Sequence, residues 1–256
     1  MSDAIRTERH DGVVEFVLNT PDRGNVVNEE WVAALDAAVA GVGDQDRCVL
    51  LRAEGKNFCF GGDVASFEAD DPGERLRDLA GRFHEVLLRF DAIEVPVVVA
   101  VHGWAAGAGL SMAVIGDVLV AAEGAKFKSA YNSLGFTGDG GITYNLPRRA
   151  PWSVTMDLML SDRIMTAAEL HAVGVVSRVI PDDQFPAAAR ELAAEIAGKS
   201  RFAAVEVKRL LRQSLTTAYA EQLEAETAAI AAAAGGGDGR EGIAAFLAKR
   251  TPEFNR

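Results

Sequence analysis

The chain has few cysteines and no excess of basic residues, and both shortages exclude classes of function. Of its 256 residues, 26 are Lys or Arg and 37 are Asp or Glu, which gives a formal net charge of −11. Nucleic-acid binding depends on clustered Lys and Arg, so we expect no nucleic-acid partner. The two cysteines, Cys48 and Cys59, are too few for a disulfide framework, and the first residues lack a secretory leader pattern. We therefore expect a reducing, cytoplasmic setting.

Long apolar runs are also scarce, and the one exception extends from Val95 to Ile115. Its length suits a membrane-spanning helix, but Pro96, His102 and several glycines interrupt it. Within it, the β-branched segment Val97–Val101 precedes a Gly/Ala-rich turn and a short apolar segment. We expect a buried strand that leads into a buried helix, and no membrane partner.

Metal-ligand spacing is absent as well. The four histidines are His10, His84, His102 and His171, and none has a histidine four residues away or a suitable cysteine nearby. The pattern predicts no metal site. For His84, which lies within a predicted helix, the pattern by itself favours a packing or surface role.

Short apolar strands alternate with amphipathic helices in the first half of the chain. The expected strands are Val13–Leu18, Cys48–Arg52, Val97–Val101 and Val118–Ala122, and the expected helices between them are Glu29–Val42 and Glu74–Phe90. Strands that are apolar on both faces belong to sheets covered by helices. The sequence therefore predicts an α/β fold with βαβ crossovers.

Helical patterns dominate the chain after about residue 140, where a single strand pattern, Val175–Ile180, remains. The expected helical stretches are Pro151–Leu160, Ala167–Ala172, Pro186–Ala197, Phe202–Ile230 and Gly242–Lys249. The run Ala231–Gly237 is expected to end a helix and to form a flexible elbow, because successive glycines weaken helices.

Three glycine-rich segments are candidates for chemistry, and each also has a structural explanation. Gly61-Gly62-Asp63 follows a strand and either binds a ligand through main-chain N–H groups or makes a tight turn. Gly107-Ala108-Gly109 opens a helix, where unpaired N–H groups suit an oxyanion or small residues allow close packing. Asp139 lies among glycines ahead of a predicted helix and is either a base or a helix cap.

Taken together and in order, these segments resemble the enoyl-CoA hydratase/isomerase family, also called the crotonase family. The matching pieces are Asn19–Asn28, Phe58–Asp63, Pro96–Gly103 with its Gly/Ala turn, Leu134–Pro147, Thr166–Pro181 and Glu241–Phe254. The resemblance implies a spiral of ββα units followed by a C-terminal helical trimerisation region. We expect residues 1–195 to form the catalytic core and residues 196–256 the assembly region of a homotrimer or a dimer of trimers.

The resemblance also implies an acyl-CoA thioester as substrate, with coenzyme A as part of that substrate and no separate cofactor. The shared chemistry is stabilisation of a thioester enolate by two main-chain N–H groups, which match Gly62 and Ala108. Phe60 departs from the family, whose members commonly have a small residue there, and its ring is expected to reshape the pocket. Residues implied in substrate or CoA binding are Arg23, Val26, Gly61, Asp63, Val64, Phe246 and Lys249, the last often reaching a neighbouring subunit.

The acid/base positions depart most from the family. Hydratases of the family use two glutamates to handle the attacking water, and those positions match Ser111 and Tyr131 here. Asp139 matches the aspartate with which some isomerase-type members move a proton from C2 to C4, although Gly138 replaces their usual proline. Asp139 also matches the nucleophile of the 4-chlorobenzoyl-CoA dehalogenase branch, and His84 matches the histidine of that branch.

We therefore predict an enoyl-CoA double-bond isomerase with Asp139 as the proton shuttle and with Tyr131 shaping or hydrogen-bonding the pocket. Two alternatives stay open. The first is a hydratase, hydrolase or dehalogenase of the same family that acts on an unusual acyl group. The second is a non-catalytic acyl-CoA-binding subunit, suggested by the absence of both hydratase glutamates.

Overall fold

Six strands form the main sheet of the computed structural model, which describes residues 4–68 and 71–254. In sheet order they are β1 (Ile5–His10), β2 (Val13–Leu18), β3 (Cys48–Ala53), β4 (Val97–Val101), β6 (Val118–Ala122) and β9 (Arg178–Ile180). β1 runs antiparallel to β2, and the later pairs are parallel. The predicted α/β class is confirmed. Strand β1 was not expected, because its mostly exposed, charged residues show no apolar pattern.

A second, three-stranded sheet gives the fold its spiral character. It consists of β5 (Trp104–Ala106), β7 (Lys126–Lys128) and β8 (Met165–Thr166). β4 pairs with β6 in the main sheet, and the strands that directly follow them, β5 and β7, pair in the small sheet. Each of these turns of the chain thus adds one strand to each sheet and then enters a helix, as the expected ββα spiral requires.

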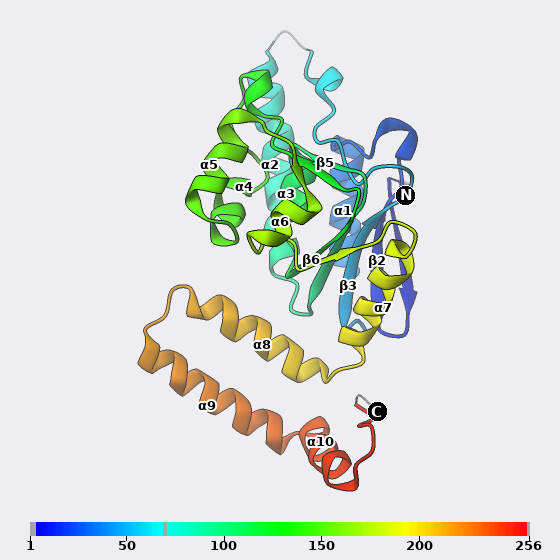
Figure 1. The fold of residues 1–256 in the computed structure, drawn as a ribbon, viewed down its shortest axis with the longest axis vertical. Coiled ribbons are helices and arrows are strands. Elements are labelled where there is room, and N and C mark those ends of the chain that lie inside the picture. The colour runs from blue at the N-terminus through cyan, green and yellow to red at the C-terminus, as the bar shows by residue number, and fades with distance from the viewer. Residues whose placement is uncertain (1–3, 69–70, 255–256) are drawn as a thin grey trace.

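Helices cover both faces of the main sheet (Figure 1). Those of the core are α1 (Glu29–Ala40), α2 (Pro72–Asp91), α3 (Ala108–Ala113), α4 (Ile142–Asn145), α5 (Trp152–Ser161), α6 (Ala167–Ala172) and α7 (Phe185–Ala197). Neighbouring residues of a strand point to opposite faces. Glu15 of β2 bonds to Arg190 of α7, at 2.9 Å, while Phe16 packs edge-on against Phe90 of α2. The strands are therefore buried on both faces, which explains their continuous apolar runs.

Three helices at the C-terminus project away from this core (Figure 1). They are α8 (Arg201–Ser214), α9 (Tyr219–Gly235) and α10 (Gly237–Ala248). Lys208 of α8 is buried against the core, where its Nζ lies 2.7 Å from Asp117 Oδ2 and donates to the carbonyl oxygen of Val95 at 2.9 Å. Burial lowers the pKa of Lys208, and Asp117 opposes that shift. In the described chain, no helix combines the length and the apolar composition needed to span a membrane.

Two sequence-based expectations for this region were wrong. The expected helical stretch Phe202–Ile230 is broken between α8 and α9, although the sequence has no glycine or proline at that point. The helix then continues through most of the expected elbow, and the chain turns only at Gly236. Just beyond this turn Gly239 serves close packing, because a Cβ there would lie only 2.0 Å from the carbonyl oxygen of Ala233.

Candidate active site

The glycine-rich turns after β3 and β5 meet in space, although they are far apart in the sequence. The main-chain N–H of Ala106 donates to the carbonyl oxygen of Cys59 at 3.0 Å. A Cβ on Gly61, at φ +95°, would lie 2.9 Å from Ala106 O, and one on Gly109 would lie 2.2 Å from Cys59 O. Glycine is therefore required at both positions for the two main chains to approach this closely.

Gly62 and Ala108 line one cavity of about 470 Å³ beside this contact. Ala108 is the first residue of α3, and the first N–H groups of a helix have no partner within it. In the described part of the chain, no hydrogen bond joins the N–H of Gly62 or Ala108 to another group. Two residues whose main-chain N–H groups have no partner in the described chain therefore line the same cavity.

The walls of the cavity are largely apolar. They include Phe60, Val64, Phe67, Leu76, Ala80, Leu134 and Phe136, together with Tyr131. Phe60 lies over Gly24, where an added Cβ would come within 2.6 Å of its ring. Among the described lining residues, Asp139 is the only one with a charged side chain. If the cavity does acid/base chemistry with a carboxylate, the structure offers Asp139 for it.

Asp139 is held by both its side chain and its main chain. Its Oδ1 lies 2.6 Å from Nε2 of His84 on α2. Its carbonyl oxygen accepts hydrogen bonds from Ser111 Oγ at 2.7 Å and from the Tyr131 hydroxyl at 3.2 Å. The alternative role as a helix cap is wrong, because α4 is preceded by Gly141 at its N-cap and the Asp139 carboxylate contacts His84 instead.

Tyr131 and Ser111 occupy the positions that the resemblance assigned to the hydratase glutamates. Their hydroxyl oxygens lie 3.0 Å apart, and both donate to the Asp139 main chain. Burial is the main cause that raises the pKa of Tyr131, so its phenol stays protonated and acts as a donor. Both hydroxyls therefore support the Asp139 segment, and neither position supplies a carboxylate for water activation.

His84 is the site residue that sequence reasoning missed. Its pattern favoured packing or surface exposure, and its match to the dehalogenase histidine was not enough to place it in the predicted site. The structure joins it to Asp139 across 55 positions of sequence. The one pointer in the sequence is the resemblance that matches His84 with the dehalogenase histidine, since no local pattern on α2 pairs this residue with Asp139.

The residues predicted to contact CoA around Arg23 and around Gly61 lie together. Val27, next to Val26, donates its N–H to Gly61 O at 2.7 Å and accepts from Asp63 N at 3.0 Å. Arg23 forms an ion pair with Asp63, at 2.8 Å. Val64 begins the short 3-10 helix η2 (Val64–Phe67) at the wall of the cavity.

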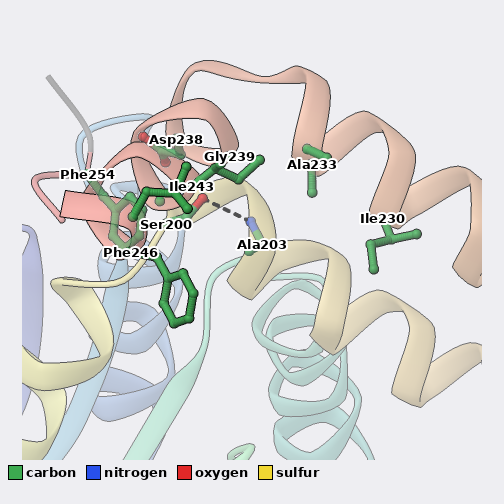
Figure 2. Close-up of a pocket in the computed structure, with 12 residues that line it drawn as sticks. Ser200, Ala203, Ile230, Ala233, Asp238, Gly239, Ile243, Phe246 and Phe254 are labelled. Atoms are coloured by element: carbon green, nitrogen blue, oxygen red, sulfur yellow. Dashed lines mark hydrogen bonds between the residues drawn. The ribbon is translucent and has the colours of Figure 1, made fainter. Parts of the chain in front are cut away.

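Phe246 and Lys249 lie elsewhere in the chain. Phe246 is 83% exposed and lines a separate groove of about 460 Å³ between α8, α9 and α10. Figure 2 shows this groove with Ile230, Ile243 and Phe254 around it. Lys249 caps α10 in the left-handed conformation, with φ +53°. Within one chain, neither residue joins the cavity that contains Asp139.

No three His, Cys, Asp or Glu side chains of the described chain gather where they could hold a metal ion. The buried Cys59 is also a poor nucleophile, since burial raises the pKa of its thiol to about 12.

Comparison with known proteins shows which family this chain resembles. The model of the family described as enoyl-CoA hydratase/isomerase matches residues 8–256. The 1,2-epoxyphenylacetyl-CoA isomerase of Escherichia coli K12 is 35% identical, with 99% of each chain covered. The 2,3-dehydroadipyl-CoA hydratase of the same organism is 31% identical, also with 99% of each chain covered. The crystal structure of an enoyl-CoA hydratase from Polaromonas sp. JS666 superimposes with a TM-score of 0.92 at 28% identity, covering 98% of this chain and 99% of that one.

These similarities define an acyl-CoA-transforming enzyme with the crotonase fold. The chain belongs to the enoyl-CoA hydratase/isomerase family. Its relatives include both isomerases and hydratases, so family membership alone leaves the reaction open.

Proposed function

We propose that this protein is an acyl-CoA double-bond isomerase that converts a 3-enoyl-CoA into the conjugated 2-enoyl form. The observation that carries the proposal is the placement of one carboxylate, Asp139, in the same cavity as the N–H groups of Gly62 and Ala108. An allylic isomerisation needs one group that removes a proton and returns it. Hydration needs one group that deprotonates the attacking water and one that protonates the substrate carbon. At the positions that match the hydratase glutamates, Ser111 and Tyr131 supply hydroxyls instead of carboxylates.

In this mechanism the thioester oxygen of the substrate accepts hydrogen bonds from the Gly62 and Ala108 N–H groups. Asp139 removes a proton from C2, and the electron pair moves to the thioester oxygen as a dienolate forms. Both donors belong to residues that line the cavity, and in the proposed role they stabilise the developing charge on the thioester oxygen. Asp139 then returns the proton to C4, which leaves the double bond between C2 and C3. No separate cofactor takes part, because coenzyme A belongs to the substrate.

A second candidate is isomerisation of an aromatic acyl-CoA. Phe60, Phe67, Tyr131 and Phe136 all line the cavity, and such rings suit a flat acyl group. The name of the E. coli relative, 1,2-epoxyphenylacetyl-CoA isomerase, supports this candidate. Both candidates use the same carboxylate and donors, and they differ in the acyl group presented to them.

A panel of substrates separates these reactions. A rise in the absorbance of the conjugated thioester from a 3-enoyl-CoA supports isomerisation. Loss of that absorbance from a 2-enoyl-CoA indicates hydration, and release of free CoA thiol indicates hydrolysis. An acyl group found on Asp139 by mass spectrometry supports the dehalogenase-like alternative. Tight CoA-ester binding without turnover of any substrate supports a non-catalytic subunit.

We also propose that the chain assembles as a homotrimer or a dimer of trimers. The projecting helices expose large apolar side chains, among them Val207, Leu211, Leu215, Ile230, Ile243, Phe246 and Leu247. Exposed apolar patches of this kind mark association surfaces. Contact with a neighbouring copy would also explain why Phe246 and Lys249 lie away from the cavity of their own chain.

A further inference from the structure

The contact between His84 and Asp139 is a feature that the proposed isomerase mechanism has not used. His84 Nε2 lies 2.6 Å from Asp139 Oδ1, and the two side chains are 49% and 37% exposed. In the described chain this is the one polar contact that the His84 side chain makes. Asp139 is partly exposed, so a proton that it takes from the substrate can exchange with water. A hydrogen-bond partner can reduce this loss by controlling which carboxylate oxygen receives the proton.

The chemistry of the two groups fixes the direction of the hydrogen bond. An ionised carboxylate has no proton and can only accept. Nε2 of His84 must therefore carry the proton and donate it to Oδ1 when Asp139 acts as a base. This bond occupies Oδ1, and Oδ2 remains as the oxygen with free lone pairs for the substrate.

Neighbouring residues fix the position of Asp139, so that Oδ1 stays bonded to His84 and Oδ2 stays free. Hydrogen bonds from Ser111 Oγ and the Tyr131 hydroxyl fix the position of its carbonyl oxygen. The next residue, Gly140, has φ +62°, and a Cβ there would lie 3.0 Å from both the Phe83 ring and Ser111. The chain can thus pass against α2 only with glycine at this point, and the passage brings Asp139 to His84.

We infer that His84 is a positioning residue that keeps the transferred proton on Oδ2 of Asp139. This inference rests on the proposed isomerase function. In the first step the C2–H bond breaks and its proton forms an O–H bond with Oδ2, while the electron pair enters the dienolate. In the second step the same O–H bond breaks, the proton joins C4, and Asp139 returns to its carboxylate form. The bond from Nε2–H disfavours protonation of Oδ1, so the proton is held on Oδ2 between the two steps.

The test follows a label from C2 to C4. A 3-enoyl-CoA carrying deuterium at C2 is converted in ordinary water, and mass spectrometry measures the share of deuterium at C4 in early product. Wild type is compared with His84→Gln, which keeps an N–H near the Nε2 position, and with His84→Phe, which keeps a ring but has no donor. His84 is half exposed, so both variants are expected to fold, and their thermal melting is measured as a check.

We expect deuterium to be transferred from C2 to C4 in wild type and in His84→Gln. In His84→Phe we expect the share of deuterium at C4 to be several-fold lower. We also expect kcat of His84→Phe to fall about ten-fold with KM little changed, the size of one charge-assisted hydrogen bond at a partly exposed site. Equal label transfer in wild type and His84→Phe overturns the inference. Loss in His84→Gln as large as in His84→Phe also overturns it, because a donor at that position would then have no effect.

A measurement without substrate separates this inference from the proposed function. Nitrogen-15 shifts of the His84 ring report which nitrogen carries the proton, in wild type and in Asp139→Ala. We expect the Nε2–H form in wild type and a mixture of the two neutral forms in the variant. Identical shifts in the two proteins overturn the contact itself. If no 3-enoyl-CoA is turned over but the shifts differ as expected, the proposed function fails while the His84–Asp139 contact stands.

Discussion

Replacing Ala108 by proline removes one N–H donor of the cavity and leaves the helix that presents it. Ala108 is the first residue of α3, the position at which proline costs no helical hydrogen bond. The residue before it, Gly107, has φ +53° and ψ −126°, outside the right-handed helical region that a following proline disfavours. The substitution therefore removes this donor without removing a hydrogen bond of α3, and the proline Cδ takes the place of the N–H hydrogen.

The expected cost follows from what the Ala108 N–H does in the structure. It has no partner in the described chain, so it is free to donate to a bound substrate. Loss of one donor from an oxyanion hole costs roughly 2.7–4 kcal/mol, or about 10²–10³ in kcat. We expect a loss of this size in Ala108→Pro with a 3-enoyl-CoA as substrate.

Ala108→Gly is the matched control, because it also changes the side chain but keeps the N–H. We expect its kcat to stay close to that of wild type, and CoA-ester binding to remain measurable in both variants. A kcat for Ala108→Pro within about three-fold of Ala108→Gly would refute the assignment of this N–H as an oxyanion donor.

Two further predictions concern stability and assembly. Burial would raise the pKa of Glu15, but hydrogen bonds from Arg52 and Arg190 outweigh it and lower that pKa below its ordinary value of 4.5. The stability that Glu15 contributes is thus present above that value and lost as pH falls through the lowered one. Urea unfolding should show Glu15→Gln about 3 kcal/mol less stable near neutral pH, with the difference narrowing in acid; a difference independent of pH contradicts this reasoning. Light scattering should give a mass of three or six chains of 27.2 kDa for the wild type. Leu211→Glu on α8 should lower this mass. A wild-type mass of one chain contradicts the proposed trimer.

Much of the fold could be predicted from the sequence because its central strands are buried on both faces. The expected bounds of β2, β4, β6 and α6 match the structure, and each is a short segment with a clear apolar pattern. β5, β7 and β8 were not identified as strands, because two or three residues are too few to show a period. The order of strands within the two sheets depends on contacts between distant segments, which no local pattern contains.

Part of the candidate site could likewise be predicted from the sequence, and part could not. The glycine-rich segments by themselves left two roles open for Gly62, Ala108 and Asp139, and the family resemblance selected the catalytic one; the structure places all three in one cavity. The contact of Asp139 with His84 could not be selected, since it depends on how the chain at Gly140 passes against α2. A role that arises from tertiary contact leaves little trace in the residues on either side.

The decisive measurement is the isomerisation rate of Asp139→Asn beside wild type, with the same 3-enoyl-CoA and with CoA-ester affinity measured in both. Asparagine preserves the shape of the side chain but cannot accept the C2 proton. We predict a kcat lower by about 10²–10⁴ with affinity retained, as expected for loss of a general base. An unchanged rate in Asp139→Asn would contradict the role of Asp139 as the proton shuttle.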